Sequence, residues 1–119
     1  MPYQNPSIAL IIVNWNSGKW LNKCLKGVAN LSIAPSRVIL VDNASTDNSL
    51  EGAEDIIPTI DIIHSGSNLG FAAGNNLALR TVTDEEWVVL LNPDAIPERT
   101  WLEELLRAAK EYSSFDFFA

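Results

Sequence analysis

One carboxylate in this sequence, Asp94, lies in a setting that suits a metal ion. It follows a run of apolar residues and stands beside Pro93 in the segment VVLLNPDAIPE, residues 88–98. A hard divalent cation prefers oxygen ligands, and magnesium often takes one or two protein carboxylates together with the phosphates of a substrate. A carboxylate on a turn stiffened by proline, at the edge of a sheet, meets that need, although a turn alone would also explain the proline.

A second carboxylate, Asp42, follows another apolar run and could accept hydrogen bonds from the imide N–H of a base or from ribose hydroxyls. It could equally cap the next helix, a role for which Ser45 is also available. Trp15 interrupts a polar loop, where its ring could stack on a flat base or belong to the core. Gly70 and Gly74 flank the start of an expected helix, where they permit close backbone approach and where phosphate groups bind. These residue types locate a pocket without naming its ligand.

The other reactive side chains offer less. His64 is the only histidine, and since no cysteine or serine motif accompanies it, we expect a strand-end residue and not a catalyst. Cys24 lies on the apolar face of an expected helix, and a single cysteine permits neither an internal disulfide nor a zinc cluster, so a reducing, cytosolic setting fits best. The glycine spacings of the dinucleotide-binding and P-loop motifs are both absent, which weakens the case for NAD- and ATP-binding folds.

Short apolar runs must place these side chains, and they alternate with helical patterns along the chain. The runs are IALIIV (8–13), RVILV (37–41), IDIIH (60–64) and WVVLL (87–91). Because they are short, β-branched and mainly apolar, they are typical of strands buried on both faces of a sheet. The helical patterns occupy 17–31, 45–56, 70–80 and 97–112.

The alternation of strands and helices predicts an α/β fold, with a mostly parallel sheet and flanking helices. In open parallel sheets, ligands bind beyond the carboxyl ends of the strands. The segments at those ends are all polar and all contain asparagine, and they are NWNS (14–17), DNASTD (42–47), SGSNLG (65–70) and NPDA (92–95). We therefore expect Trp15, Asp42 and Asp94 to share one cleft, although such residues are also common in ordinary turns.

Composition limits the possible classes of protein. The chain has 119 residues, the size of one domain, and with 47% hydrophobic and 19% charged residues it should be globular. Its longest apolar run, 8–13, is far too short to span a bilayer, and its first residues lack the features of a signal peptide. A net charge of −7 argues against a nucleic-acid partner held by its phosphate backbone. It does not exclude a small anionic ligand, because backbone amides and a metal ion can hold phosphates.

The last segment, SSFDFFA (113–119), resumes an apolar pattern and then stops. We expect a fifth strand to begin here and to be cut short, so that the single domain, 1–119, is truncated near 115–119. Truncation is favoured because exposed aromatic side chains are a liability at a native terminus. The alternative is a frayed tail that packs by its aromatic side chains.

Segments at four points along the chain closely resemble family 2 glycosyltransferases of the GT-A fold. They are IALIIVNWNSGKWLNKCL, VILVDNASTDNS, NLGFAAGNNLAL and VVLLNPDAIPE, and the resemblance covers about residues 7–112. The similarity is to bacterial, rhamnosyltransferase-like members, which often carry N-P-D where others carry D-x-D. It implies the Rossmann-like, nucleotide-sugar-binding half of a GT-A fold, a divalent metal (Mg2+ or Mn2+) and transfer of the sugar with inversion. It also implies a UDP- or dTDP-sugar donor, with rhamnose as one candidate sugar. The implied acceptor is a glycan or a lipid-linked glycan, in polysaccharide biosynthesis at the cytosolic face of the membrane.

The resemblance also assigns roles by position. Val13, Asn14 and Trp15 match the first-strand segment that contacts the base. Asp42 matches the carboxylate that binds the base and ribose, and Asn43 begins the loop beside it. A carboxylate partner is compatible with both uracil and thymine.

The remaining assignments concern the sugar and the diphosphate. The residues that match the lining of the donor pocket are Asn68, Gly70, Phe71 and Asn75. Asn92 and Asp94 match the first and last positions of D-x-D, so Asp94 would hold the metal on the diphosphate. Asn92 replaces a carboxylate, which predicts weak metal binding without the nucleotide. The family's catalytic base lies in a later, acceptor-side half, so we expect it beyond Ala119 and expect the isolated chain to be inactive.

Other classes of protein compete with this enzyme. A non-catalytic, flavodoxin- or receiver-like signalling module would need an acidic cluster after its first strand, where NWNS has no acid. A sugar nucleotidyltransferase would usually show a Gly-rich basic loop there, and NSGKW offers one glycine and one lysine. The sequence names neither the sugar, the base, the acceptor nor the oligomeric state.

Overall fold

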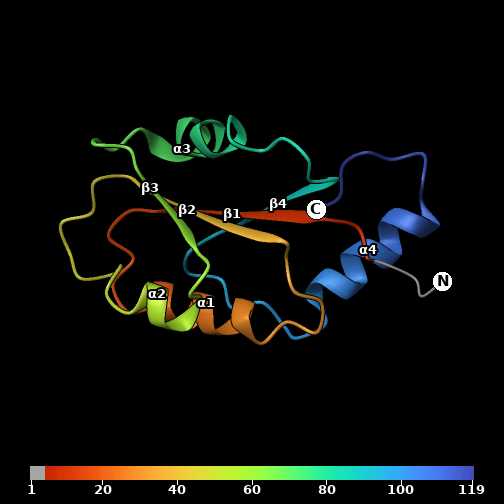
Figure 1. Ribbon diagram of the computed structural model, residues 1–119, viewed down its shortest axis with the longest axis horizontal. Helices are drawn as coiled ribbons and strands as arrows, with labels where there is room; N and C mark the ends of the chain where they lie inside the picture. Colours follow the sequence, from red (N-terminus) through yellow and green to blue (C-terminus); the bar gives the residue numbers. More distant parts are fainter. Residues whose placement is uncertain (1–4) are drawn as a thin grey trace.

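The computed structural model describes residues 5–119, and within them strands and helices alternate in the expected order (Figure 1). The strands are β1 (Ile8–Asn14), β2 (Arg37–Asp42), β3 (Asp61–His64) and β4 (Trp87–Leu91). They form one sheet in the order β3-β2-β1-β4, and each neighbouring pair is parallel. The prediction of an α/β fold with a parallel sheet is confirmed.

The two central strands are buried, whereas the two edge strands are partly exposed. Every residue of β1 is buried, and in β2 only Arg37 is partly exposed. Exposed residues occur in both β3 and β4, which lie at the edges of the sheet. The prediction that all four runs are buried on both faces is therefore wrong for β3 and β4, because the helix Gly70–Leu79 packs over β1 and β2 and leaves the edge strands partly uncovered.

Helices cover both faces of the sheet (Figure 1). Three of them, α1, α2 and α4, pack on one face, and α3 packs on the other, over β1 and β2. Their bounds are α1 (Trp20–Ala29), α2 (Ala53–Ile56), α3 (Gly70–Leu79) and α4 (Trp101–Glu111). Within residues 5–119, every helix is too short or too polar to span a bilayer.

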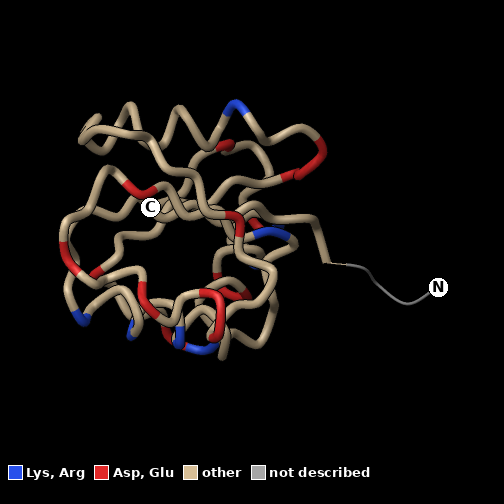
Figure 2. The backbone as a smooth tube through the Cα atoms, turned by 60° about the vertical axis from the view of Figure 1, so that its left-hand side comes forward, with Lys and Arg blue, Asp and Glu red and all other residues tan. Residues whose placement is uncertain are grey.

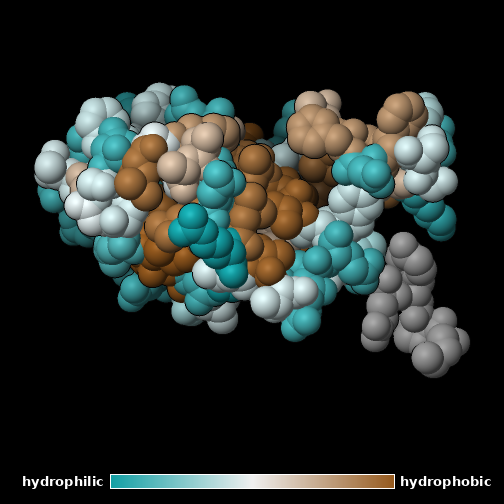
Figure 3. Space-filling view, turned by 90° about the horizontal axis from the view of Figure 1, so that it is seen from above, coloured by the Kyte–Doolittle hydropathy of each residue, from teal (hydrophilic) through white to brown (hydrophobic). Residues whose placement is uncertain are grey.

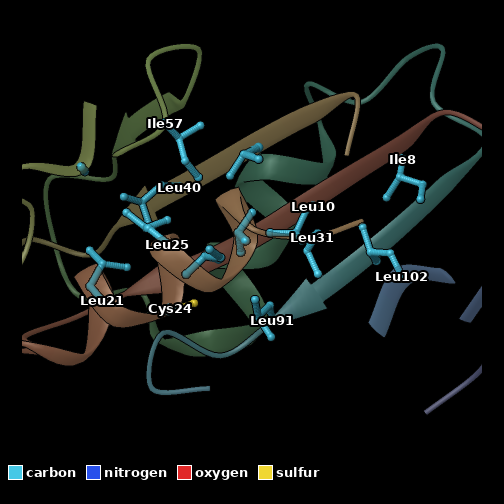
Figure 4. Packing of buried hydrophobic residues seen from close by; sticks show 14 residues of the cluster. Ile8, Leu10, Leu21, Cys24, Leu25, Leu31, Leu40, Ile57, Leu91 and Leu102 are labelled. Carbon is cyan, nitrogen blue, oxygen red and sulfur yellow. The ribbon is translucent and has the colours of Figure 1, made fainter. Parts of the chain in front are cut away.

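Alternate side chains of β1 enter two separate cores, as the two-residue period of a strand requires. Ile8, Leu10 and Ile12 join the larger core with α1 and α4, and Ile11 and Val13 join the smaller core with α3. Figure 4 shows how leucine and isoleucine side chains of helices and strands interleave in the larger core. Complete burial of one such side chain contributes about 1.5–3 kcal/mol, so β1 anchors both layers.

One face of β4 stays uncovered. Trp87, Val89 and Leu91 join the larger core, so Val88 and Leu90 point to the opposite face, where they are 37% and 45% exposed. Seen from the α3 side, hydrophobic surface lies open in the middle of the molecule (Figure 3). The apolar side chains of β4 therefore divide between one face that is mostly buried and one face that is exposed.

The second helix is much shorter than the 45–56 pattern predicts. α2 spans only Ala53–Ile56, so Ser45 caps no helix. The Ser45 hydroxyl instead donates to Asp42 at 2.6 Å, and polar side chains after it also form local or cross-loop hydrogen bonds. Such bonds compete with helix formation and hold the preceding residues as a loop.

The expected fifth strand is not formed at residues 113–119. The ring of Phe118 packs against Trp87 with 6.2 Å between centroids, which is what the alternative, a tail that packs by its aromatic side chains, predicts for this one residue. Phe117 in the same tail is 83% exposed. The prediction of a domain truncated near 115–119 stays a prediction.

Candidate functional site

The polar loops after the strands lie along one edge of the sheet, as expected for parallel strands. The register aligns Asn14 of β1 with Asp42 of β2, and Asp42 with His64 of β3. On the other side of β1, β4 ends at Leu91, so Asp94 follows β4 at the same edge. Since neighbouring strands lie about 5 Å apart, the ends of β2 and β4 are separated by roughly 10 Å across β1.

Asp42 is a buried carboxylate that the fold already holds in place. Its exposed fraction is 4%. Its Oδ1 accepts hydrogen bonds from Asn14 Nδ2 at 3.0 Å and from the Ser45 hydroxyl at 2.6 Å, and its Oδ2 accepts one from the Ser45 backbone N–H at 3.2 Å. A carboxylate can accept about four hydrogen bonds, so Oδ2 keeps capacity for one further donor. The alternative role of Asp42 as a helix cap is wrong, because no helix begins until Ala53.

Several polar residues that the sequence interpretation did not single out brace this end of the site. They are Asn16, Asp47 and Ser49. Asn16 Oδ1 accepts the backbone N–H groups of residues 46 and 47, and Asp47 Oδ2 accepts the Gly18 N–H at 2.9 Å. The sequence signal for these residues is the small polar residues repeated in both loops, which are also common in ordinary turns and helix caps.

Two of the residues assigned to the ligand present aromatic rings at the surface. Trp15 is 53% exposed and Phe71 is 55% exposed. The core alternative for Trp15 is therefore wrong, and its ring is available for stacking. Val13, which precedes this loop, is 8% exposed and packs in the smaller core.

The residues expected to line a donor pocket meet between β2 and the start of α3. Asn43 Nδ2 donates to the Gly70 carbonyl at 3.0 Å, and the Gly70 N–H donates to Asn68 Oδ1 at 3.1 Å. Asn75 is 5% exposed, and its Nδ2 donates to a backbone carbonyl of its own helix. The Oδ1 atoms of Asn43 and Asn75, like that of Asn14, are buried without a partner in the protein. Such buried acceptors without a partner are uncommon, and these three atoms are closed to solvent in the structure.

The two glycines near the start of α3 have different structural roles. A Cβ on Gly74 would lie 2.8 Å from Val13 Cγ1, so this glycine allows α3 to approach β1 closely. Gly70 adopts φ +83° with open space around it, and it allows the turn into the helix. A close backbone approach therefore occurs at Gly74, where α3 packs against β1.

The loop after β4 carries Asp94 and Asn92, and both side chains are exposed. The Cys24 Sγ lies 3.6 Å from the Asn92 carbonyl, and burial together with the nearby Asp94 charge raises the pKa of the Cys24 thiol to about 12. Cys24 is thus a core residue, as expected. A Cβ on Gly27 would lie 2.8 Å from Pro97 Cδ, so α1 packs tightly beneath this loop.

The described residues offer a metal ion one carboxylate and not a complete ligand set. Among residues 5–119, no group of three or more His, Cys, Asp or Glu side chains could hold an ion. An exposed Asp94 still fits a site at which phosphate oxygens supply further ligands. Asn92 can add an amide oxygen there but no second negative charge.

Two hollows on the described surface are lined by residues other than Trp15, Asp42 and Asp94. One, of about 380 Å³, is lined mainly by apolar residues of β4, α4 and the segment 116–119. The other, of about 520 Å³, is open and is lined by Gly18, Lys19, Asn22, Asn48, Glu51 and Gly52. Neither is lined by Trp15, Asp42 or Asp94, so their common cleft stays a prediction.

Comparisons with known proteins agree on one family. The model of the family described as "Glycosyl transferase family 2" matches residues 9–115. The O-antigen chain rhamnosyltransferase WbaN of Salmonella anatum is 33% identical over 104 residues, which are 85% of this chain and 32% of that protein. The N-acetylglucosaminyl-diphospho-decaprenol L-rhamnosyltransferase of Mycobacterium tuberculosis is 24% identical over 115 residues, 88% of this chain and 38% of that protein. The chain thus spans about a third of the length of these curated relatives.

Solved structures share the fold. TarS of S. aureus superposes with a TM-score of 0.78 at 21% identity, over 90% of this chain and 33% of that chain. A mannosyltransferase from Pyrobaculum calidifontis, solved in complex with GDP-Man and Mn2+, superposes with a TM-score of 0.75 at 25% identity, over 92% of this chain and 33% of that chain. The predicted fold is thereby confirmed.

Proposed function

Because the chain belongs to glycosyl transferase family 2 and has the GT-A fold, we propose that it is the donor-binding half of an inverting glycosyltransferase. The donor would be a UDP- or dTDP-sugar, and rhamnose is a candidate sugar because two of the relatives are rhamnosyltransferases. Family membership removes the support for a signalling module or a sugar nucleotidyltransferase. The proposal rests on one observation above all, the position of a buried Asp42 and an exposed Asp94 at the same sheet edge, on either side of β1.

At the β2 end, the base and ribose would bind beside Asp42. Its Oδ2 accepts only the Ser45 N–H and can take one more donor, such as the imide N–H of uracil or thymine or a ribose hydroxyl. The exposed ring of Trp15 would stack on the base. The buried side chains of Asn43 and Asn75 would shape the wall of the donor pocket, through their hydrogen bonds to the Gly70 and Phe71 carbonyls.

At the β4 end, the diphosphate would bind with a divalent cation. The chain carries a net charge of −7, and Figure 2 shows its basic residues interspersed with acidic ones, so its side chains supply little positive charge for a diphosphate. Asp94 would hold Mg2+ or Mn2+, with Asn92 beside it, and the mannosyltransferase of similar fold was solved with Mn2+. When bound, such an ion offsets the charge that develops on the leaving diphosphate.

The residues that bind the acceptor, and the residue that acts as catalytic base, would lie outside residues 1–119. The relatives are about three times as long as the part matched here, which leaves room for an acceptor-binding half. One relative is named for a decaprenol-linked acceptor, so we include a lipid-linked glycan and a peripheral position at the cytosolic membrane face in the proposal. The isolated chain would bind its donor and transfer little or no sugar.

A titration with UDP, dTDP and GDP, each with and without Mn2+, tests this proposal by calorimetry or NMR. We expect metal-assisted binding of UDP or dTDP, with the resonances of Trp15, Asp42 and Asp94 among those that shift. A chain that binds none of the three nucleotides under either condition would contradict the proposal. Detectable sugar transfer by the isolated chain would contradict the part that places the base elsewhere.

A further inference from the structure

We propose that Asp47 is a positioning residue for the nucleotide site, which acts through Ser49 and Asn14 to fix the carboxylate of Asp42. This inference rests on the proposed function, because it takes Asp42 as the acceptor for the base or ribose. Asp47 itself is exposed, follows no strand and lies five residues from Asp42 along the chain. Its role would be indirect, through a path of hydrogen bonds that the structure shows at each step.

The first step of the path joins Asp47 to Ser49. The Ser49 hydroxyl donates to Asp47 Oδ1 at 2.6 Å, and the Ser49 backbone N–H donates to the same oxygen at 3.1 Å. The hydrogen bond from the Ser49 hydroxyl, helped by backbone N–H groups including that of Gly18, lowers the pKa of Asp47 despite its partial desolvation. Asp47 is therefore ionised at neutral pH and fixes the direction of the Ser49 hydroxyl proton.

The second step joins Ser49 to Asp42. Because the Ser49 proton is committed to Asp47, the Ser49 oxygen presents a lone pair to Asn14 Nδ2, which lies at 2.9 Å. The same Nδ2 donates to Asp42 Oδ1 at 3.0 Å and, with a longer distance of 3.2 Å, to the Ser45 hydroxyl oxygen. Asn14 and Ser49 are 0% and 2% exposed, so water cannot replace these bonds easily. The opposite amide orientation would place the Asn14 oxygen against the Asp42 carboxylate without a proton between them, so Asp42 and Ser49 together select one orientation of Asn14.

A second set of hydrogen bonds joins Asp47 to the loop that carries Trp15. Asp47 Oδ2 accepts the Gly18 N–H at 2.9 Å, and Asn16 Oδ1 accepts the backbone N–H of Asp47 at 3.2 Å. Asn16 has φ +47°, in the left-handed region that asparagine adopts more readily than most residues with a side chain. Asp47 thus lies at the junction of the two segments that would enclose the base.

The test compares the unchanged chain with Asp47→Ala and Ser49→Ala, and uses Asp55→Asn on α2 as a control at an exposed acid. Affinities for UDP and for uridine are measured by titration. Uridine carries the base and ribose without phosphates, so it reports the Asp42 end alone. We expect Asp47→Ala and Ser49→Ala to weaken both ligands by the same factor, about tenfold, as the loss of one charged hydrogen bond implies, and Asp55→Asn to change neither.

NMR distinguishes a positioning role of Asp47 from a merely structural one, because it reports on the Asn14 and Asp42 side chains directly. We expect the side-chain amide resonances of Asn14 and the carboxyl carbon of Asp42 to shift in Asp47→Ala, in a chain whose other resonances keep their folded dispersion. Unchanged Asn14 and Asp42 resonances, or a lowered melting temperature with uridine affinity unchanged, would overturn the inference. If the unchanged chain binds neither ligand, the proposed function fails, and the positioning claim is then decided by the Asn14 and Asp42 resonances alone.

Discussion

The two ends of the candidate site are built in opposite ways. Asp42, at the end of β2, is 4% exposed and accepts three hydrogen bonds, two of them from Ser45 and one from Asn14. Asp94, beyond β4, is exposed and forms no hydrogen bond or ion pair with any other residue of 5–119. Its loop is held at other residues, by the close packing of Gly27 against Pro97 and by hydrogen bonds from Cys24 Sγ and the Ala95 N–H to the Asn92 carbonyl.

This difference separates what the fold provides from what a ligand must provide. The fold fixes the Asp42 carboxylate before any ligand arrives, so it can contribute affinity without a large ordering cost. Asp94 keeps its oxygens free, which suits a carboxylate that must share a cation with phosphate oxygens. We therefore expect metal-independent affinity to depend on the Asp42 end, and metal-dependent affinity to depend on the Asp94 end.

The largest effect should come from Asp42→Asn. The substitution places an amide group where donors converge on a buried carboxylate, so we expect the free energy of unfolding to fall by about 2–4 kcal/mol. Nucleotide binding should be lost with and without Mn2+. Urea denaturation measures the first effect, and Asp94→Asn is the matched control, with an expected change within about 0.5 kcal/mol. Equal losses of stability in the two variants would contradict the contrast between the two ends.

A pair of glycine substitutions should perturb the two ends separately. In both Gly74→Ala and Gly27→Ala the new Cβ would lie 2.8 Å from a neighbouring atom, of Val13 and Pro97 respectively, and we expect each to cost about 1–3 kcal/mol of stability. Gly74→Ala should weaken nucleotide binding measured without metal, because it displaces α3 near Asn43. Gly27→Ala should reduce only the gain in affinity that Mn2+ brings. The contrast fails if both variants change the same component of binding.

A smaller, pH-dependent effect should come from Cys24, beneath the Asp94 loop. Burial and the Asp94 charge raise the pKa of this thiol to about 12 from an ordinary value of 9.0, so the folded chain keeps the proton that the unfolded chain releases. Stability should therefore fall as pH rises from 9 toward 12, and by pH 10 the loss should be about 1 kcal/mol relative to Cys24→Ala. Urea denaturation of both chains at pH 8 and pH 10 measures it. Parallel changes in the two chains would show that the thiol does not titrate in this way.

The sequence predicted those parts of the fold in which local pattern and tertiary packing agree. The continuous apolar runs of β1 and β2 identify central strands, and Asn and Asp directly after them mark the carboxyl edge that holds the candidate site. The runs of β3 and β4 look the same in the sequence, but their exposure depends on where they lie in the sheet. The order of strands in a sheet is a tertiary property, and a residue pattern does not encode it locally.

The brace around Asp42 was not predictable for a related reason. Ser45, Asp47 and Ser49 are residue types that also cap helices, and the 45–56 pattern opens with such residues, which predicts a helix there. In the structure these three residues form hydrogen bonds with Asp42, Gly18 and Asn14, respectively. Gly18 and Asn14 lie about 30 residues away along the chain from their partners. Only the pairing of β1 with β2 brings those partners within reach.

The most direct test of the account is the Mn2+ dependence of nucleotide binding in Asp94→Asn. UDP and dTDP are titrated into the unchanged chain and into this variant, each with and without Mn2+. The account predicts that Mn2+ strengthens binding to the unchanged chain by about tenfold or more, and that Asp94→Asn keeps the metal-free affinity but gains nothing from Mn2+. An equal gain from Mn2+ in both chains would contradict the assignment of Asp94 and, with it, the division of the site into a preformed end and a metal-dependent end.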